Sequence, residues 1–159
     1  YIDLGKHKGM YEKAGKVKTE LLYLTVLYPF RKVVVEENLQ AFRPGLSSAK
    51  TLMTLAQFNG VIRWICHSDL NTEVESINVN TARKNVGIKI DRKSKKKTKE
   101  QVWDWVKVAN NSDQNKIQWP FKTLKSGPNK GQTRLCNEAY DVADAYVIGK
   151  SYFLLKNDT

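Results

Sequence analysis

The sequence predicts a single domain of the α/β class in which helices flank a mixed β-sheet. Its 159 residues, 41% of them hydrophobic, are enough to build one core. Short runs rich in valine and isoleucine alternate with longer segments whose apolar residues recur at helical spacing. An order of strand, helix, strand, helix, strand, helix is typical of layered α/β folds.

The N-terminal part predicts the end of a strand, a helix and a second strand. Tyr1-Ile2-Asp3 is typical of the end of a strand whose beginning lies outside the numbered chain. From about Met10 to Leu27 the pattern is helical, and Pro29 closes the segment. One face of this helix carries Val17, Leu21, Leu24 and Tyr28. Lys32 to Glu36 includes three consecutive valines and predicts a strand buried on both faces.

The middle of the chain predicts a long helix and another strand. Ser47 or Ser48 can cap a helix that continues to about His67. The apolar positions of this helix include Leu52, Leu55, Phe58, Ile62 and Ile65. Glu75 to Asn80 predicts a second short strand, which carries Ile77 and Val79.

The C-terminal half predicts two helices separated by a loop. Thr98 is expected to cap a helix whose apolar residues are Val102, Trp103, Val106 and Val108. Residues 110–131 are polar, with glycines near the end, and predict a loop or insertion. Within it, Trp119-Pro120-Phe121 is either a wedge at a DNA branch point or, as we favour, an anchor for the loop. The final helix is expected from about Asn137 to Leu155.

The charge balance indicates a polyanionic partner. The chain has 27 Lys and Arg against 16 Asp and Glu, which gives a net charge of +11. Basic side chains that neutralise phosphates release condensed counterions, and this favours nucleic acid. An anionic membrane is the alternative polyanion, but the sequence has no basic amphipathic helix and no apolar run long enough to span a bilayer. We therefore expect nucleic acid, and no membrane, as the partner.

The cysteines and the N-terminus favour a cytoplasmic protein. Cys66 and Cys136 are far apart and have no Cys or His at metal-ligand spacing, which predicts reduced thiols. No signal peptide is visible.

A dense basic run lies before the helix expected at Thr98. It contains six positive charges in eight residues: Arg92, Lys93, Lys95, Lys96, Lys97 and Lys99. Such a run is either a solvated face or a surface that contacts phosphates, which position a nucleic acid without reading its bases. We take these residues, with Arg83 and Lys84, as the candidate DNA contacts.

Four acids stand out because they lie in or next to apolar stretches. Asp3 ends the first expected strand, Glu36 ends the valine run, and Asp141 and Asp144 share one face of the final helix. Each alone has a simpler explanation, as a strand-end acid, a cap or a solvated helix face. Clustered carboxylates repel one another and are usually tolerated when a cation neutralises them. Because Mg²⁺ prefers carboxylate oxygens, the set predicts a metal site.

These segments resemble the RuvC family of Holliday-junction resolvases, above all its phage-encoded members. Ile2-Asp3-Leu4-Gly5 followed by Gly9 resembles the first motif of the family, and Val34-Val35-Glu36-Glu37 resembles the second. The stretch from Val86-Gly87-Ile88 to Lys99-Glu100-Gln101-Val102 resembles its glycine loop and the helix behind it. Asp141-Val142-Ala143-Asp144-Ala145 resembles the last motif, and this match is the most specific.

The resemblance implies an RNase H-like fold with a central mixed β-sheet and an endonuclease that cleaves branched DNA in recombination and repair. It implies two Mg²⁺ ions, for which Mn²⁺ can substitute, held by Asp3, Glu36, Asp141 and Asp144. Glu36 is preferred to Glu37 because the glutamate of the family directly follows the apolar run. The same resemblance places Lys99 near the scissile phosphate, and it locates the protein in the cytoplasm of a bacterial or phage-infected cell.

The resemblance also implies a homodimer in which the long second helix forms the interface. Apolar residues of that helix occupy more than one face, which requires a second partner surface. Phe58 is the first candidate for the residue most exposed in the isolated protomer. The loop at 110–131 is the alternative cover for this face.

Three features depart from the family. The first motif is one residue shorter between Asp3 and Gly9 than the usual spacing. The family has a β-hairpin between its first motif and its first helix, whereas only Gly9-Met10 separates them here. We therefore expect a segment to be missing from the continuous numbering near residues 9–10. The 110–131 loop is also longer than in the family.

Two other functions remain open from sequence alone. A non-catalytic nucleic-acid-binding module would use the same basic surface, but it has no reason to gather four acids. Another RNase H-like enzyme, such as a nuclease for RNA–DNA hybrids or a strand-transfer core, would use the acids but differ in its last helix.

Overall fold

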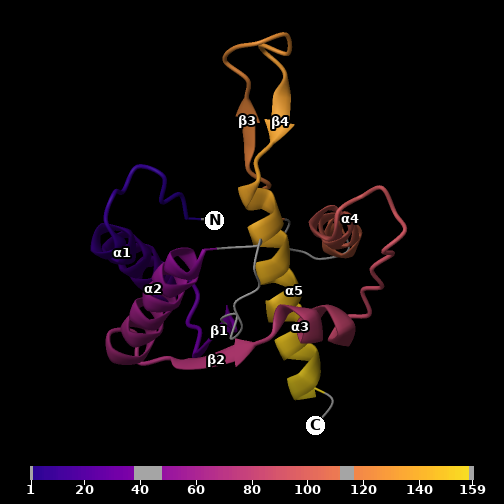
Figure 1. Cartoon of the computed structure of the whole chain (residues 1–159). Coiled ribbons are helices and arrows are strands. Elements are labelled where there is room, and N and C mark those ends of the chain that lie inside the picture. The colour runs from indigo at the N-terminus through magenta and orange to yellow at the C-terminus, as the bar shows by residue number, and fades with distance from the viewer. Residues whose placement is uncertain (1, 38–47, 112–116, 158–159) are drawn as a thin grey trace. The chain divides into compact units, whose positions relative to one another are not determined.

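The computed structural model describes residues 2–37, 48–111 and 117–157 (Figure 1). This part of the chain contains five helices and four strands and divides into two compact units. The first unit comprises residues 2–78, and the second begins at Val79. The mixed α/β class predicted from the sequence is confirmed.

The first unit is built on a parallel pair of strands. Its elements are α1 (Met10–Leu27), β1 (Lys32–Glu36), α2 (Ala49–Ser68) and β2 (Glu73–Ile77). The two strands run parallel, with Lys32 opposite Glu73 and Glu36 opposite Ile77. A parallel pair needs a crossover, and α2 provides it. Helices α1 and α2 pack against each other.

Local chemistry explains where these elements begin and how the strands pair. Ser48 caps α2, because its hydroxyl oxygen accepts a hydrogen bond from the backbone N–H of Thr51 at 3.1 Å, which confirms the expected cap. The ammonium group of Lys32 forms ion pairs with Glu73 at 2.7 Å and Glu75 at 3.1 Å across the strands. The predicted bounds of α1 and β1 are confirmed.

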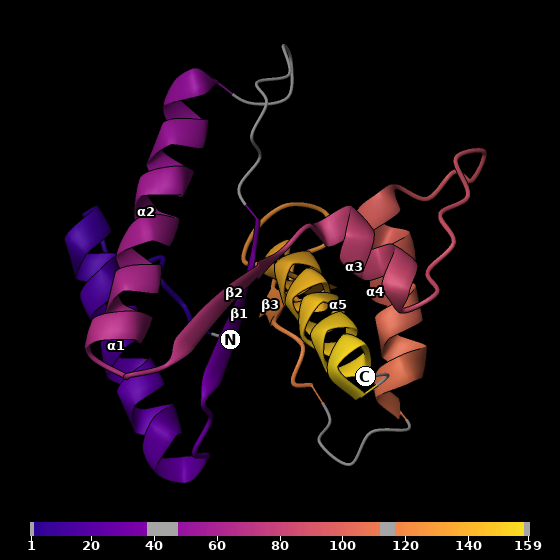
Figure 2. The ribbon, with the colours of Figure 1, turned by 90° about the horizontal axis from the view of Figure 1, so that it is seen from below.

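The second unit consists of three helices and a hairpin. Its elements are α3 (Val79–Asn85), α4 (Thr98–Asn111), β3 (Phe121–Thr123), β4 (Thr133–Leu135) and α5 (Glu138–Asn157). Both α3 and α4 pack against α5, as Figure 2 shows. Small and β-branched residues form this core: Ala82, Val102, Val106, Ala139, Ala143, Val147 and Ile148 are buried. Alanines on α3 and α5 allow the helices to approach closely.

The structure corrects three expectations about local elements. Ile2 and Asp3 are not in a strand, because a turn follows at once: Gly5 N–H bonds to the Asp3 carboxylate and His7 N–H bonds to the carbonyl of Leu4. The strand expected from Glu75 to Asn80 spans 73–77 instead, and Val79 begins the unpredicted helix α3.

The third correction concerns the start of α4. Thr98 is the first helical residue and not the cap. The carboxylate of Glu100 accepts a hydrogen bond from Lys97 N–H at 2.7 Å and so satisfies a donor before the first turn.

The sheets also differ from the single mixed sheet that the sequence predicts. Within the described residues, β1 and β2 form one two-stranded sheet, and β3 and β4 form a separate antiparallel one. The three valines of β1 are therefore half-buried rather than buried on both faces. The segment 110–131, expected to be a loop, contributes β3 to the hairpin.

None of the described helices has both the length and the apolar composition that crossing a membrane requires. Cys66 is buried and Cys136 is half-buried, and both are free thiols.

Candidate functional site

The acid pair of α5 lies near the start of that helix. Asp141 and Asp144 flank the buried Ala143, so packing of the small residue against the core fixes the direction of both carboxylates. Partial burial raises the pKa of Asp141 above its ordinary value, and Asp144 and Glu138 raise it further, whereas Lys99 opposes the shift. Burial and these acidic neighbours therefore disfavour the ionised form of Asp141, and a bound cation would favour it.

Cations from two other helices lie beside this pair. The guanidinium of Arg83, on α3, forms an ion pair with Asp144 at 2.8 Å, and the two side chains are only 15% and 23% exposed. Lys99, in the first turn of α4, places its ammonium nitrogen 4.5 Å from the centre of the Tyr140 ring. Helices α3, α4 and α5 thus bring two acids and two cations together, although Arg83 was predicted only as a DNA contact.

A basic pocket of about 390 Å³ adjoins Arg83. Its lining includes four cationic side chains, those of Arg83, Lys84, Lys89 and Arg92, together with Asn80. Among the described residues, Lys84, Lys89 and Arg92 form no ion pair. The Nε atom of Arg83 is buried and has no hydrogen-bond partner in the same part of the chain. These uncompensated donors suit a phosphate group.

The sequence predicted three of these four cations and missed Lys89. Lys89 lies between Ile88 and Ile90, which line the same pocket, and no local pattern in the sequence distinguishes it from other lysines. Gly87 precedes the three residues with a φ of 80°, a left-handed conformation that favours glycine and turns the chain out of α3.

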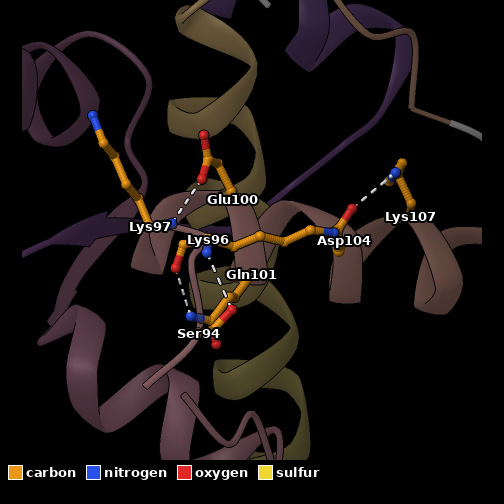
Figure 3. A network of polar contacts seen from close by, with 7 residues as sticks. All are labelled: Ser94, Lys96, Lys97, Glu100, Gln101, Asp104 and Lys107. Atoms are coloured by element: carbon orange, nitrogen blue, oxygen red, sulfur yellow. Dashed lines mark hydrogen bonds and ion pairs between the residues drawn. The ribbon is translucent and has the colours of Figure 1, made fainter. Parts of the chain in front are cut away.

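The basic run is an ordered loop rather than a free tail (Figure 3). The amide of Gln101 holds it: its oxygen accepts from Asp91 N–H, and its nitrogen donates to the carbonyls of Asp91 and Lys96, all at 2.9 Å. The ammonium of Lys96 pairs with Asp104 at 2.6 Å, and Lys107 pairs with the same carboxylate at 2.9 Å. The side chain of Lys97, in contrast, points away from the ion pair between Lys96 and Asp104, although its backbone N–H bonds to Glu100. Lys93, Lys95 and Lys97 are exposed.

The other two predicted ligands belong to the first unit. The Asp3 carboxylate accepts a hydrogen bond from Gly5 N–H at 2.8 Å, and a Cβ at Gly5 would come within 3.2 Å of the same oxygen. The absence of a Cβ at Gly5 therefore leaves room for the Asp3 carboxylate in this turn. Glu36 lies at the end of β1, and its carbonyl accepts from the Asn59 amide at 3.3 Å. Glu36 and Glu37 both line the same pocket, so the preference for Glu36 remains a prediction.

Comparison of the chain with protein-family models, with curated proteins and with solved structures finds no match. The assignment of function therefore depends on the geometry of these residues.

The described residues of each unit, taken by themselves, contain no complete metal site. Within the described part of each unit, no group of three or more Asp, Glu, His or Cys side chains could hold a metal ion. The acid pair of α5 belongs to one unit, whereas Asp3 and Glu36 belong to the other. Convergence of all four acids stays a prediction, and it requires both units.

We expect Asp141→Asn to raise the free energy of unfolding in metal-free buffer at neutral pH. Because the folded-state pKa of Asp141 is raised above 3.8, the contribution of this group to stability is fully present below that pH. It is lost as the pH rises through the folded-state pKa. In urea unfolding across this pH range, the free energy of unfolding of the variant should exceed that of the parent by an amount that increases with pH. Stabilities that stay equal at every pH would contradict the prediction.

Asp104→Asn is the matched control for that experiment. Hydrogen bonds from Lys96 and Lys107 lower the pKa of Asp104, so its ionised form stabilises the fold above its ordinary pKa. The contribution is lost as the pH falls through the lowered value. Replacing Asp104 should therefore lower stability at neutral pH, with the opposite sign to Asp141→Asn.

Proposed function

We propose that this chain is a metal-dependent endonuclease with an RNase H-like core that cleaves branched DNA, Holliday junctions above all, with forks and flaps as further candidate substrates. One observation carries the proposal: Arg83 connects the acid pair of α5 to a pocket lined by uncompensated cations. Carboxylates that suit divalent cations thus lie next to donors that suit phosphate. This combination is typical of enzymes that act on phosphodiesters.

Each residue has a distinct expected role. Asp3, Glu36, Asp141 and Asp144 would hold two Mg²⁺ ions, which supply an activated water and neutralise the leaving oxygen. Lys99, close enough to oppose the pKa shift of Asp141, would stabilise charge on the scissile phosphate. Arg83 orients Asp144 through their ion pair. Lys84, Lys89 and Arg92 would bind a phosphate on the same strand.

A non-catalytic nucleic-acid-binding module is the second candidate. It is favoured by the basic pocket and by the exposed Lys93, Lys95 and Lys97 in the loop before α4, which do not require the acids. An assay with matched junction, fork, flap and duplex substrates distinguishes the two. The nuclease should cut the junction in Mg²⁺ or Mn²⁺ and only bind it in EDTA. Binding without cutting in either metal would support the module.

We also propose that the enzyme acts as a two-fold symmetric homodimer through α2, because a four-way junction needs paired cuts. Helix α2 exposes large apolar side chains: Met53 and Trp64 are each 67% exposed. Phe58, the first candidate from the sequence, is instead half-buried and lines the pocket between β1 and α2. Trp64 is therefore the better site for a test.

Trp64→Glu is expected to convert the dimer into monomers, since a buried carboxylate at an apolar interface is costly. Sedimentation at micromolar concentration measures the change, and junction cleavage should shift from paired to single cuts. Val108→Glu, at a position 74% exposed on α4, serves as the control and should leave the dimer intact. A parent protein that sediments as a monomer with and without junction DNA would contradict the dimer but not the nuclease.

A further inference from the structure

The β3–β4 hairpin projects into solvent from the start of α5 (Figure 1). All three residues of β3 are exposed, as are Thr133 and Arg134 of β4. Residues 125–132 between the strands are exposed as well. The hairpin therefore does not contribute its side chains to the core of the unit, and an isolated two-stranded hairpin gains little stability by itself.

The base of the hairpin is nevertheless held in place. Cys136 N–H donates to the carbonyl of Pro120 at 3.0 Å just before α5 begins. The Trp119 ring packs edge-on against Trp103 of α4, with the ring centres 6.0 Å apart and an angle of 81° between the planes. This contact supports the anchor interpretation of Trp119. The Trp119–Trp103 contact attaches the start of the hairpin to α4, and β4 leads directly into α5.

The hairpin carries only positive charge. Residues 117–137 contain Lys122, Lys125, Lys130 and Arg134 and no Asp or Glu. Lys122 lies directly opposite Arg134 in the antiparallel register, so two like charges face each other on one side of the ribbon. Such a pair destabilises a hairpin. A polyanion bound along this face would remove the repulsion.

We propose that the β3–β4 hairpin is an arm that binds the phosphodiester backbone of a duplex branch, with Lys122 and Arg134 on phosphates. A two-stranded ribbon of this kind fits the major groove of B-form DNA. The contacts are to phosphates and so do not read sequence. The proposal rests on DNA as the ligand of the proposed function, but not on cleavage. None of these four cations belongs to the candidate contacts predicted from the sequence.

The test compares duplex DNA binding by two variants with the same change in net charge. Lys122→Gln/Arg134→Gln removes the facing cations, and Lys150→Gln/Lys156→Gln removes two cations toward the other end of α5. Affinity is measured with labelled duplex in EDTA over a series of KCl concentrations. Each phosphate contact contributes about 0.9 to the slope of log affinity against log salt. The hairpin variant should lose about 2 from this slope and bind roughly ten-fold more weakly; the control should match the parent.

A charge reversal separates DNA binding from a role in folding. Lys122→Glu should place an acid opposite Arg134, so the melting temperature of the free protein should hold or rise while DNA affinity falls. A fall in melting temperature in both hairpin variants would overturn the proposal in favour of a structural role. A parent-like salt slope in the double variant would also overturn it.

Two further outcomes keep this proposal distinct from the others. If the parent fails to cleave in Mg²⁺ but the hairpin variant loses DNA affinity in EDTA, DNA binding by the hairpin is supported and the nuclease assignment is contradicted. If the parent cleaves and the hairpin variant binds DNA as tightly as the parent, the role of the hairpin is contradicted and the nuclease assignment is retained. Parent protein that binds phosphatidylserine vesicles through the same two cations, and duplex DNA without them, would overturn the choice of ligand.

Discussion

Asp144→Asn is expected to reduce Mg²⁺-dependent cleavage of a four-way junction by about 10²–10³-fold, while junction affinity in EDTA stays within about two-fold of the parent. The amide keeps the shape of the side chain but removes the negative charge that a metal ion requires, and loss of a group that stabilises developing charge has effects of this size. Gel-shift and cleavage assays on the same junction measure the two quantities separately. Equal losses of affinity and cleavage would contradict a catalytic role.

The structure changes what this variant should do to stability. From the sequence, removing one of two repelling acids predicts a fold at least as stable as the parent. In the structure, however, Asp144 neutralises the part-buried guanidinium of Arg83 at 2.8 Å. Losing that partner should lower the free energy of unfolding by about 1–2 kcal/mol, less than for a fully buried pair because both side chains retain some solvent.

Asp104→Asn provides the matched control for cleavage. Asp104 also pairs with cations, Lys96 and Lys107, but it lies on α4 away from the acid pair in sequence and has no assigned catalytic role. This variant should lose stability and keep cleavage at saturating junction. If it lost cleavage to the same extent as Asp144→Asn, the loss would report general destabilisation.

The second large effect concerns Lys99. Lys99→Ala should lower the cleavage rate at saturating junction by about 10²–10³-fold, because it removes positive charge where the scissile phosphate would carry developing negative charge. The effect should fall on kcat, and Lys99→Arg should restore part of it. A change in KM alone would assign Lys99 to ground-state phosphate binding instead.

Lys107→Ala is the control for that experiment. Lys107 is on the same helix and lies over an aromatic ring as Lys99 does, with its ammonium nitrogen 3.7 Å from the centre of a Trp103 ring. It should cost some stability through the lost cation–π contact and leave kcat near the parental value. Equal losses of kcat in the two variants would show that the loss of a lysine–aromatic contact, and not the loss of charge at the site, lowers the cleavage rate.

The bounds of several elements in the first unit were predictable from the sequence. The bounds of α1 and β1 and the Ser48 cap of α2 were confirmed, because apolar spacing, Pro29 and a capping hydroxyl encode them locally. The helix α3 was missed because it has seven residues and only Ala82 is buried, too little for a period to show. The hairpin was missed because its exposed strands need no alternation of apolar and polar residues.

The candidate site was predictable only in part for a similar reason. Asp141 and Asp144 are three residues apart on one helix, so their spacing alone predicts that the two carboxylates lie on the same face. The contact between Arg83 and Asp144 joins residues 61 positions apart, and no local pattern encodes it. Ion pairing by Lys96 likewise depends on Asp104, six residues beyond the start of α4. The cations of the basic run look alike in the sequence. In the structure Lys96 is paired with Asp104, whereas Lys93, Lys95 and Lys97 are exposed.

We predict that Asp3, Glu36, Asp141 and Asp144 bind the same metal ions, and Mn²⁺ binding followed by NMR measures this. Paramagnetic Mn²⁺ broadens amide signals only near its site. Titration into isotope-labelled protein should broaden the amide signals next to Asp3, Glu36 and Asp141 over the same range of Mn²⁺ concentration. Asp144→Asn should reduce the broadening of all three signals. Broadening confined to residues of one unit, or unchanged by Asp144→Asn, would contradict the shared site.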